Sequence, residues 1–245
     1  DGYLLSQFYR IIRSQCWLFL NQRTELTNIM AEVIFNGPDG RLEGRYHQSK
    51  NPNAPIAIVL HPHPLHGGNM NNRVVFIMFN NFVERGFSVL RFNFRGVGRS
   101  QGAFDNGVGE LSDAAYAFDW MQQFNSNSPF CWIGGYSFGA LISMQLMMRR
   151  PEIEGFVSIS PPAGTEDFSF LAPCPSSGLI IHGDKDTHVP LDAVKKLAQK
   201  LDGQKNISVN LRIVKGADHF YKDNMDNLSK EVASYLDNSL PPDNT

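Results

Sequence analysis

Residues 129–151 read PFCWIGGYSFGALISMQLMMRRP, and this stretch decides the fold. A short apolar run ends in a pair of glycines, and a long apolar run starts just beyond Ser137. The first run has the length of a buried strand and the second that of a helix, so the sequence predicts a strand that turns directly into a helix. Gly135 and Gly139 would let the two backbones approach closely at that turn. A serine at such a turn projects its hydroxyl away from the sheet, as a nucleophile requires.

The rest of the chain alternates between strand and helix patterns. We expect an opening hairpin over 31–35 and 42–47, and later strands over 56–61, 87–94, 130–135, 155–160, 178–183 and 207–214. Helices are expected over 74–86, 109–124, 138–150, 191–201 and 226–238. The pattern predicts a doubly wound α/β fold, with a mostly parallel sheet of about eight strands, an N-terminal antiparallel hairpin and helices on both faces.

Composition limits the possible classes of protein. The chain has 245 residues and a formal net charge of −2, which suits one large domain and gives no sign of a nucleic-acid partner. No apolar run reaches the roughly 18 residues of a membrane span. Three cysteines without metal-type spacing suit a reducing compartment, so a cytoplasmic protein is expected.

We expect residues 30–245 to form a single domain and residues 1–29 to be an N-terminal extension. Within the extension, Tyr9, Ile12, Cys16 and Phe19 have the spacing of an amphipathic helix. An arginine-rich targeting peptide is the alternative. The loop 160–177 is too short for a lid domain. Its Phe168, Phe170 and Leu171 form either one apolar wall of an open cleft or a seal over the edge of the sheet.

Partners for Ser137 follow later strands, in the order serine, aspartate, histidine. Strand GLIIHG is followed by DKDTHVP, which offers Asp184 and Asp186, and strand ISVNLRIV is followed by KGADHFY, which offers His219. The carboxyl ends of parallel strands share one edge of the sheet, so these side chains should meet there. His219 would take the serine proton and an aspartate would orient the imidazole. A purely structural glycine turn is the alternative interpretation of the serine motif.

Acyl transfer also requires two backbone N–H groups that stabilise an oxyanion. Phe138, at the start of the helix after Ser137, is expected to supply one. The other should come from HPHPLHGGNMNN, the loop after strand IAIVLH. Proline has no N–H, which leaves His63 and Leu65 as candidates, and we prefer His63.

These residues together resemble the α/β-hydrolase superfamily over essentially all of 31–238. The resemblance rests on GYSFG, HPHP, RFNFRGVGRSQG, GDKDTHVP and DHF. In that superfamily the acid usually stands in a G-x-x-D-x-x-V-P pattern, which selects Asp186 and leaves Asp184 to shape the loop. HPHP with GGNMNN is similar to a lidless, cytosolic bacterial subgroup of predicted hydrolases. The superfamily's oxyanion loop more often reads H-G-x, whereas this chain reads H-P-H. This departure concerns which residue supplies the second oxyanion N–H.

The function implied is that of a serine hydrolase, similar to a carboxylesterase, that cleaves an ester or thioester of a small molecule through an acyl-enzyme. An amidase or peptidase with the same triad is the alternative, and a non-catalytic binding scaffold is a third possibility. No cofactor and no metal are expected, because no cysteine or carboxylate set accompanies the loop histidines at ligand spacing. These histidines are His61, His63, His66, His182 and His188. The oligomeric state does not follow from the sequence.

Overall fold

The computed structural model describes residues 30–240, so the expectations for residues 1–29 fall outside the described residues. The strands are β1 (Ala31–Gly37), β2 (Gly40–His47), β3 (Ile56–Leu60), β4 (Ser88–Phe92), β5 (Cys131–Tyr136), β6 (Ile153–Ile159), β7 (Ser177–Gly183) and β8 (Val209–Val214). They form one sheet in the order β1-β2-β4-β3-β5-β6-β7-β8. The hairpin β1–β2 and the pair β2–β4 are antiparallel and every other pair is parallel, which confirms the predicted fold.

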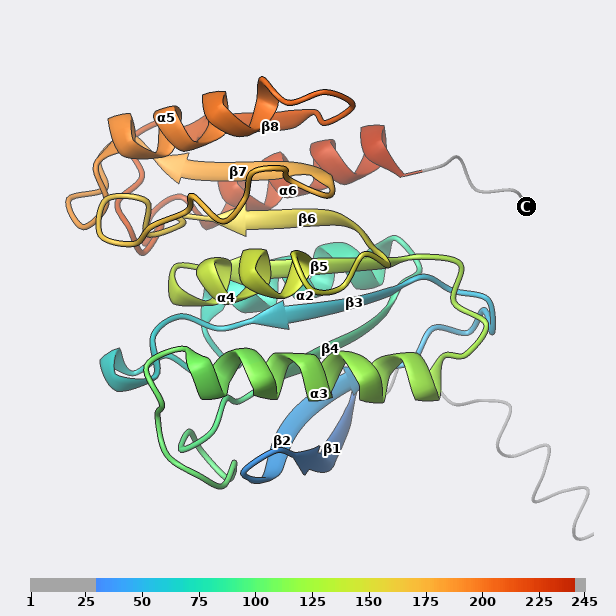
Figure 1. The fold of residues 1–245 in the computed structure, drawn as a ribbon. Coiled ribbons are helices and arrows are strands. Elements are labelled where there is room, and N and C mark those ends of the chain that lie inside the picture. The colour runs from blue at the N-terminus through green and yellow to red at the C-terminus, as the bar shows by residue number, and fades with distance from the viewer. Residues whose placement is uncertain (1–29, 241–245) are drawn as a thin grey trace, which may run out of the picture. The chain divides into compact units, whose positions relative to one another are not determined.

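The helices are α2 (Arg73–Glu84), α3 (Val108–Phe124), α4 (Phe138–Met147), α5 (Leu191–Asp202) and α6 (Met225–Ser239). Figure 1 shows α3 and α4 in front of the sheet and α2 behind it, where α2 also contacts α6. The buried side chains of α3, α4 and α5 belong to one hydrophobic cluster, so these three helices cover the same face. A short 3₁₀ helix, η1 (Pro64–His66), was not predicted.

The core follows the alternation of side chains along buried strands. In β3, Ile56, Ile58 and Leu60 lie in the cluster under α3, α4 and α5. Ala57 and Val59 are equally buried but lie outside that cluster, because successive side chains of a strand point to opposite faces. A strand covered on both faces has no solvent side, which is why its sequence reads as a continuous apolar run.

The connection from β6 to β7 is where a lid would be inserted. Residues 160–176 contain no helix or strand. Phe168 and Leu171 are buried in the core, and Phe170 packs against it. Burial of Phe168 and Leu171 favours the interpretation that they seal the sheet, whereas Phe170 is only partly buried and lines a cavity. Among residues 30–240, no helix is long and apolar enough to cross a membrane.

Candidate active site

The turn at Ser137 brings a strand and a helix together with a single residue between them. Ser137 has φ 53° and ψ −116°, a conformation that costs free energy in a residue with a Cβ. A Cβ on Gly135 would collide with the Gly139 carbonyl, and one on Gly139 would collide with the Leu60 carbonyl. The expected close approach of the two backbones at these glycines is confirmed. The partly exposed Ser137 is left at the carboxyl edge of the sheet.

Three side chains from separate loops meet at that edge. His219 Nε2 lies 3.2 Å from Ser137 Oγ, and His219 Nδ1 lies 2.7 Å from Asp186 Oδ2. An ionised carboxylate can only accept a hydrogen bond, so the imidazole proton sits on Nδ1. The lone pair of Nε2 therefore faces the serine hydroxyl. This arrangement can accept a proton from Ser137 and hold the resulting imidazolium against a negative charge.

Asp186 is held by its own loop as well as by His219. Its side chain is fully buried, and Oδ1 accepts hydrogen bonds from the backbone amides of His188 at 2.8 Å and Val189 at 2.9 Å. Burial alone would raise the pKa of Asp186, but the hydrogen bonds from His219 and the two amides outweigh it and hold the pKa below its usual range. The carboxylate is thus ionised at neutral pH. Asp184 makes a different contact, since its Oδ1 accepts a hydrogen bond from the Gly216 amide at 2.6 Å.

The position of His219 is fixed by buried phenols. The Tyr136 hydroxyl donates to the His219 carbonyl oxygen over 2.8 Å. The Tyr221 hydroxyl lies 2.9 Å from Ser160 Oγ, at the end of β6. Both rings are buried, with exposed fractions of 1% and 0%. Sequence reasoning missed Tyr136, since no pattern reveals a bond to a residue 83 positions away.

The loop after β3 is tied down by His61. His61 Nδ1 lies 2.7 Å from the Pro62 carbonyl oxygen, and His61 Nε2 accepts the Phe94 amide at 3.0 Å. Burial lowers the pKa of His61 to about 4, so the ring is neutral with its proton on Nδ1. Its part is structural, as expected for the loop histidines, and it joins the ends of β3 and β4.

The two candidate donors of this loop differ in their hydrogen bonding. The Leu65 amide donates to His63 Nδ1 at 3.2 Å, which leaves it engaged within the turn. The His63 amide makes no hydrogen bond to any residue in the range 30–240. The Phe138 amide is at the first position of α4, where a helix has no internal partner for it. The rings of His63 and Phe138 are 5.0 Å apart, so the two segments are in contact.

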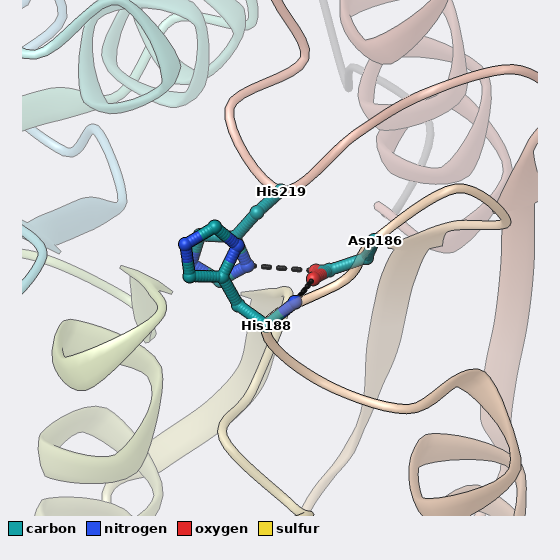
Figure 2. A group of neighbouring side chains, drawn as sticks. All are labelled: Asp186, His188 and His219. Atoms are coloured by element: carbon teal, nitrogen blue, oxygen red, sulfur yellow. Dashed lines mark hydrogen bonds and ion pairs between the residues drawn. The ribbon is translucent and has the colours of Figure 1, made fainter.

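A third ring lies beside the contact between Asp186 and His219. Figure 2 shows the exposed His188 with its ring next to that of His219, and the ring centroids are 5.0 Å apart. Asp186, His188 and His219 each offer one ligand atom, and these atoms lie within 4.8 Å of one another. The sequence argument that no carboxylate accompanies a loop histidine at ligand spacing was wrong here. The signal was present as D-x-H in GDKDTHVP.

A cavity of about 450 Å³ lies along α4, one turn beyond Ser137. It is lined by Asn106, Gly107, Val108, Leu111, Ser112, Leu141, Gln145, Met148, Arg149, Glu166 and Phe170. None of the predicted site residues lines it.

Comparisons with known proteins identify relatives with the same fold. A family model described as alpha/beta hydrolase fold matches residues 65–178, and one described as Prolyl oligopeptidase family matches residues 154–241. An uncharacterized protein of Rickettsia prowazekii (strain Madrid E) is 54% identical over 211 residues, which are 84% of this chain and 89% of that protein.

Two solved structures match most of the chain. A protein of unknown function from Agrobacterium tumefaciens, described as an alpha/beta hydrolase, is 58% identical with a TM-score of 0.84, and the match covers 87% of this chain and 100% of that one. A serine hydrolase without a lid from Xanthomonas campestris is 30% identical with a TM-score of 0.78, over 89% and 98% of the two chains. The fold and these relatives define the class as that of serine hydrolase homologues. The chain belongs to the α/β-hydrolase family.

Proposed function

We propose that this protein is a serine hydrolase that cleaves a carboxylic ester or thioester of a small molecule. The observation that carries the proposal is the unbroken chain of contacts from Asp186 through His219 to Ser137. We assign Ser137 as nucleophile, His219 as general base and Asp186 as the residue that orients it. A cytoplasmic location is part of the proposal, because Cys131 and Cys174 are buried free thiols.

In the first half of the reaction, Ser137 Oγ attacks the carbonyl carbon while its proton passes to His219 Nε2. The oxyanion of the tetrahedral intermediate accepts hydrogen bonds from the Phe138 and His63 amides, and the N-terminus of α4 adds a favourable dipole. Leu65 is the weaker candidate for the second donor, since its amide already has a partner. His219 then returns the proton to the leaving alcohol or thiol, and Ser137 carries the acyl group.

In the second half, water replaces the alcohol. His219 Nε2 takes a proton from the water as its oxygen attacks the acyl carbon, and the same two amides hold the new oxyanion. Collapse of this intermediate expels Ser137, which recovers its proton from His219. Ester, water, acid and alcohol balance, and no cofactor takes part.

Amide or peptide hydrolysis is the second candidate. The match of residues 154–241 to the Prolyl oligopeptidase family favours it, and this segment contains both Asp186 and His219. The same triad serves both reactions, so the leaving group distinguishes them. Ester hydrolysis ranks first because the sequence shows no segment that would form a subsite for a peptide chain.

The test is hydrolysis of p-nitrophenyl esters from acetate to palmitate, run beside peptide p-nitroanilides. We expect kcat/KM to be highest from acetate to butyrate, because an open site without a lid buries little acyl chain and each buried CH₂ contributes only about 0.8 kcal/mol. No rate increase is expected with emulsified substrate. Turnover of the anilides alone would favour the peptidase, and a steady rise to long chains would contradict an open site.

Tyr136 is a positioning residue in this proposal. Tyr136→Phe removes the hydrogen bond to the His219 carbonyl, so the histidine loses one of its anchors while the substrate contacts remain. We expect kcat to fall roughly tenfold with KM unchanged, since small displacements of a catalytic group are costly. The exposed Tyr116 provides the matched control, Tyr116→Phe. A lower melting temperature with normal kcat would show that the hydroxyl acts only on stability.

A further inference from the structure

We propose that Asp186, His188 and His219 form a binding site for Zn²⁺ or a similar divalent transition-metal ion, and that the bound ion switches hydrolysis off. Two imidazoles and one carboxylate are a donor set typical of zinc, with a fourth position left for water. Binding itself is independent of the proposed function, whereas the effect on turnover rests on it.

The geometry is close to what the ion requires. Zinc bonds of about 2.0–2.2 Å hold neighbouring ligand atoms roughly 3.3 Å apart in a tetrahedral site. The three ligand atoms of the cluster already lie within 4.8 Å of one another. His188 is exposed, so its ring can rotate toward the other two without disturbing the core. Asp186 is buried and held by two backbone amides, which fixes one side of the site.

Of the two His219 nitrogens, Nδ1 is the one at 2.7 Å from Asp186, so it is the nitrogen that an ion bridging the two residues would bind. A metal ion needs the lone pair of that nitrogen, so the imidazole proton must move from Nδ1 to Nε2. Nε2 then carries a hydrogen toward Ser137 Oγ, 3.2 Å away, and can no longer accept the serine proton. The neutral imidazole keeps one proton throughout, and the metal ion replaces the hydrogen bond between Asp186 and His219. The ion therefore inhibits by selecting the wrong tautomer of the base.

His188 allows the site to be tested without touching the proposed triad. His188→Ala keeps the backbone amide that donates to Asp186 and removes only the exposed ring. His66 is a second exposed histidine whose ring stacks on His63 and lies outside the cluster. His66→Ala is therefore the matched control.

The experiment uses the full chain freed of metal by EDTA and dialysis. ZnCl₂ is titrated by calorimetry and, in parallel, into p-nitrophenyl acetate hydrolysis. We expect micromolar binding of one ion with matching inhibition that EDTA reverses. His188→Ala should weaken both zinc binding and inhibition by about tenfold or more, with inhibition measured against the metal-free rate of the same variant, because loss of a ligand costs at least as much as loss of a residue that supports one. His66→Ala and, in calorimetry, Ser137→Ala should bind zinc as the unmodified protein does.

Two results would overturn the proposal. One is zinc binding that is equally tight in His188→Ala, and the other is zinc binding that depends on His188 without slowing hydrolysis. The calorimetric and the kinetic measurements also distinguish failure of this inference from failure of the proposed function. A protein that binds zinc through His188 but cleaves no ester would contradict the proposed esterase function and support the metal site.

Discussion

Ser137→Ala is expected to abolish ester turnover almost completely, with kcat reduced by roughly 10⁴-fold or more. The substitution removes the hydroxyl that lies 3.2 Å from His219 Nε2, so no acyl-enzyme can form. His219→Ala should cost about as much, because the serine proton then has no acceptor. The measurement is single-turnover hydrolysis of a p-nitrophenyl ester, together with labelling of Ser137 by a fluorophosphonate.

The double variant provides the sharper test of cooperation. Ser137→Ala combined with His219→Ala should be little slower than either single variant, since residues that act as one unit lose their effect together. Multiplicative losses would show that the two side chains act independently, which the mechanism does not allow. Unchanged melting temperatures in all three variants would exclude unfolding as the cause.

Asp186→Asn is expected to lower kcat by roughly 10⁴-fold while the protein remains folded. An asparagine amide can donate to Nδ1, and it then stabilises the tautomer with the proton on Nε2, the wrong nitrogen for a base. The backbone amides of His188 and Val189 can still donate to the side-chain oxygen, so the loop should keep its shape.

Asp184→Asn is the matched control for this prediction. Asp184 is two residues away, and its contact is with the Gly216 amide rather than with His219. We expect kcat within about threefold of the unmodified protein, because an amide oxygen can replace the carboxylate as acceptor. An equal loss in both variants would mean that the aspartates act only by shaping the loop. A larger loss in Asp184→Asn would reverse the assignment of the acid.

The sheet could be predicted well from sequence because it is covered on both faces. A strand such as β3 has no polar side, so its continuous apolar run identifies it as a buried strand. The position of β4 between β2 and β3 was not predicted, because strand order depends on contacts between elements distant in the sequence. The helix α4 ends at Met147, earlier than the predicted 150, since Met148, Arg149 and Arg150 show no local signal that marks the end of the helix before Pro151.

The predicted site residues also divide into those that a local sequence pattern identifies and those that a tertiary contact decides. Ser137 can be identified from a local sequence pattern, because the glycines on each side are needed wherever a strand turns sharply into a helix. The two candidate oxyanion donors, His63 and Leu65, are distinguished by a turn in which the His63 ring accepts a hydrogen bond from the Leu65 amide. That bond depends on a side-chain rotamer, which residue spacing does not specify.

By itself the sequence determined the class of fold, the strand-to-helix turn at Ser137 and the order of Ser137, Asp186 and His219 along the chain. These features depend on short-range patterns of polarity and on positions that only glycine can occupy. Only the tertiary structure decided that Asp186 contacts His219, that Tyr136 donates a hydrogen bond to the histidine loop and that His188 lies beside Asp186 and His219. Each of these contacts joins segments that are remote in the chain, or depends on where a loop folds. Such contacts are set by how the sheet brings its carboxyl ends together, which no local stretch of sequence encodes.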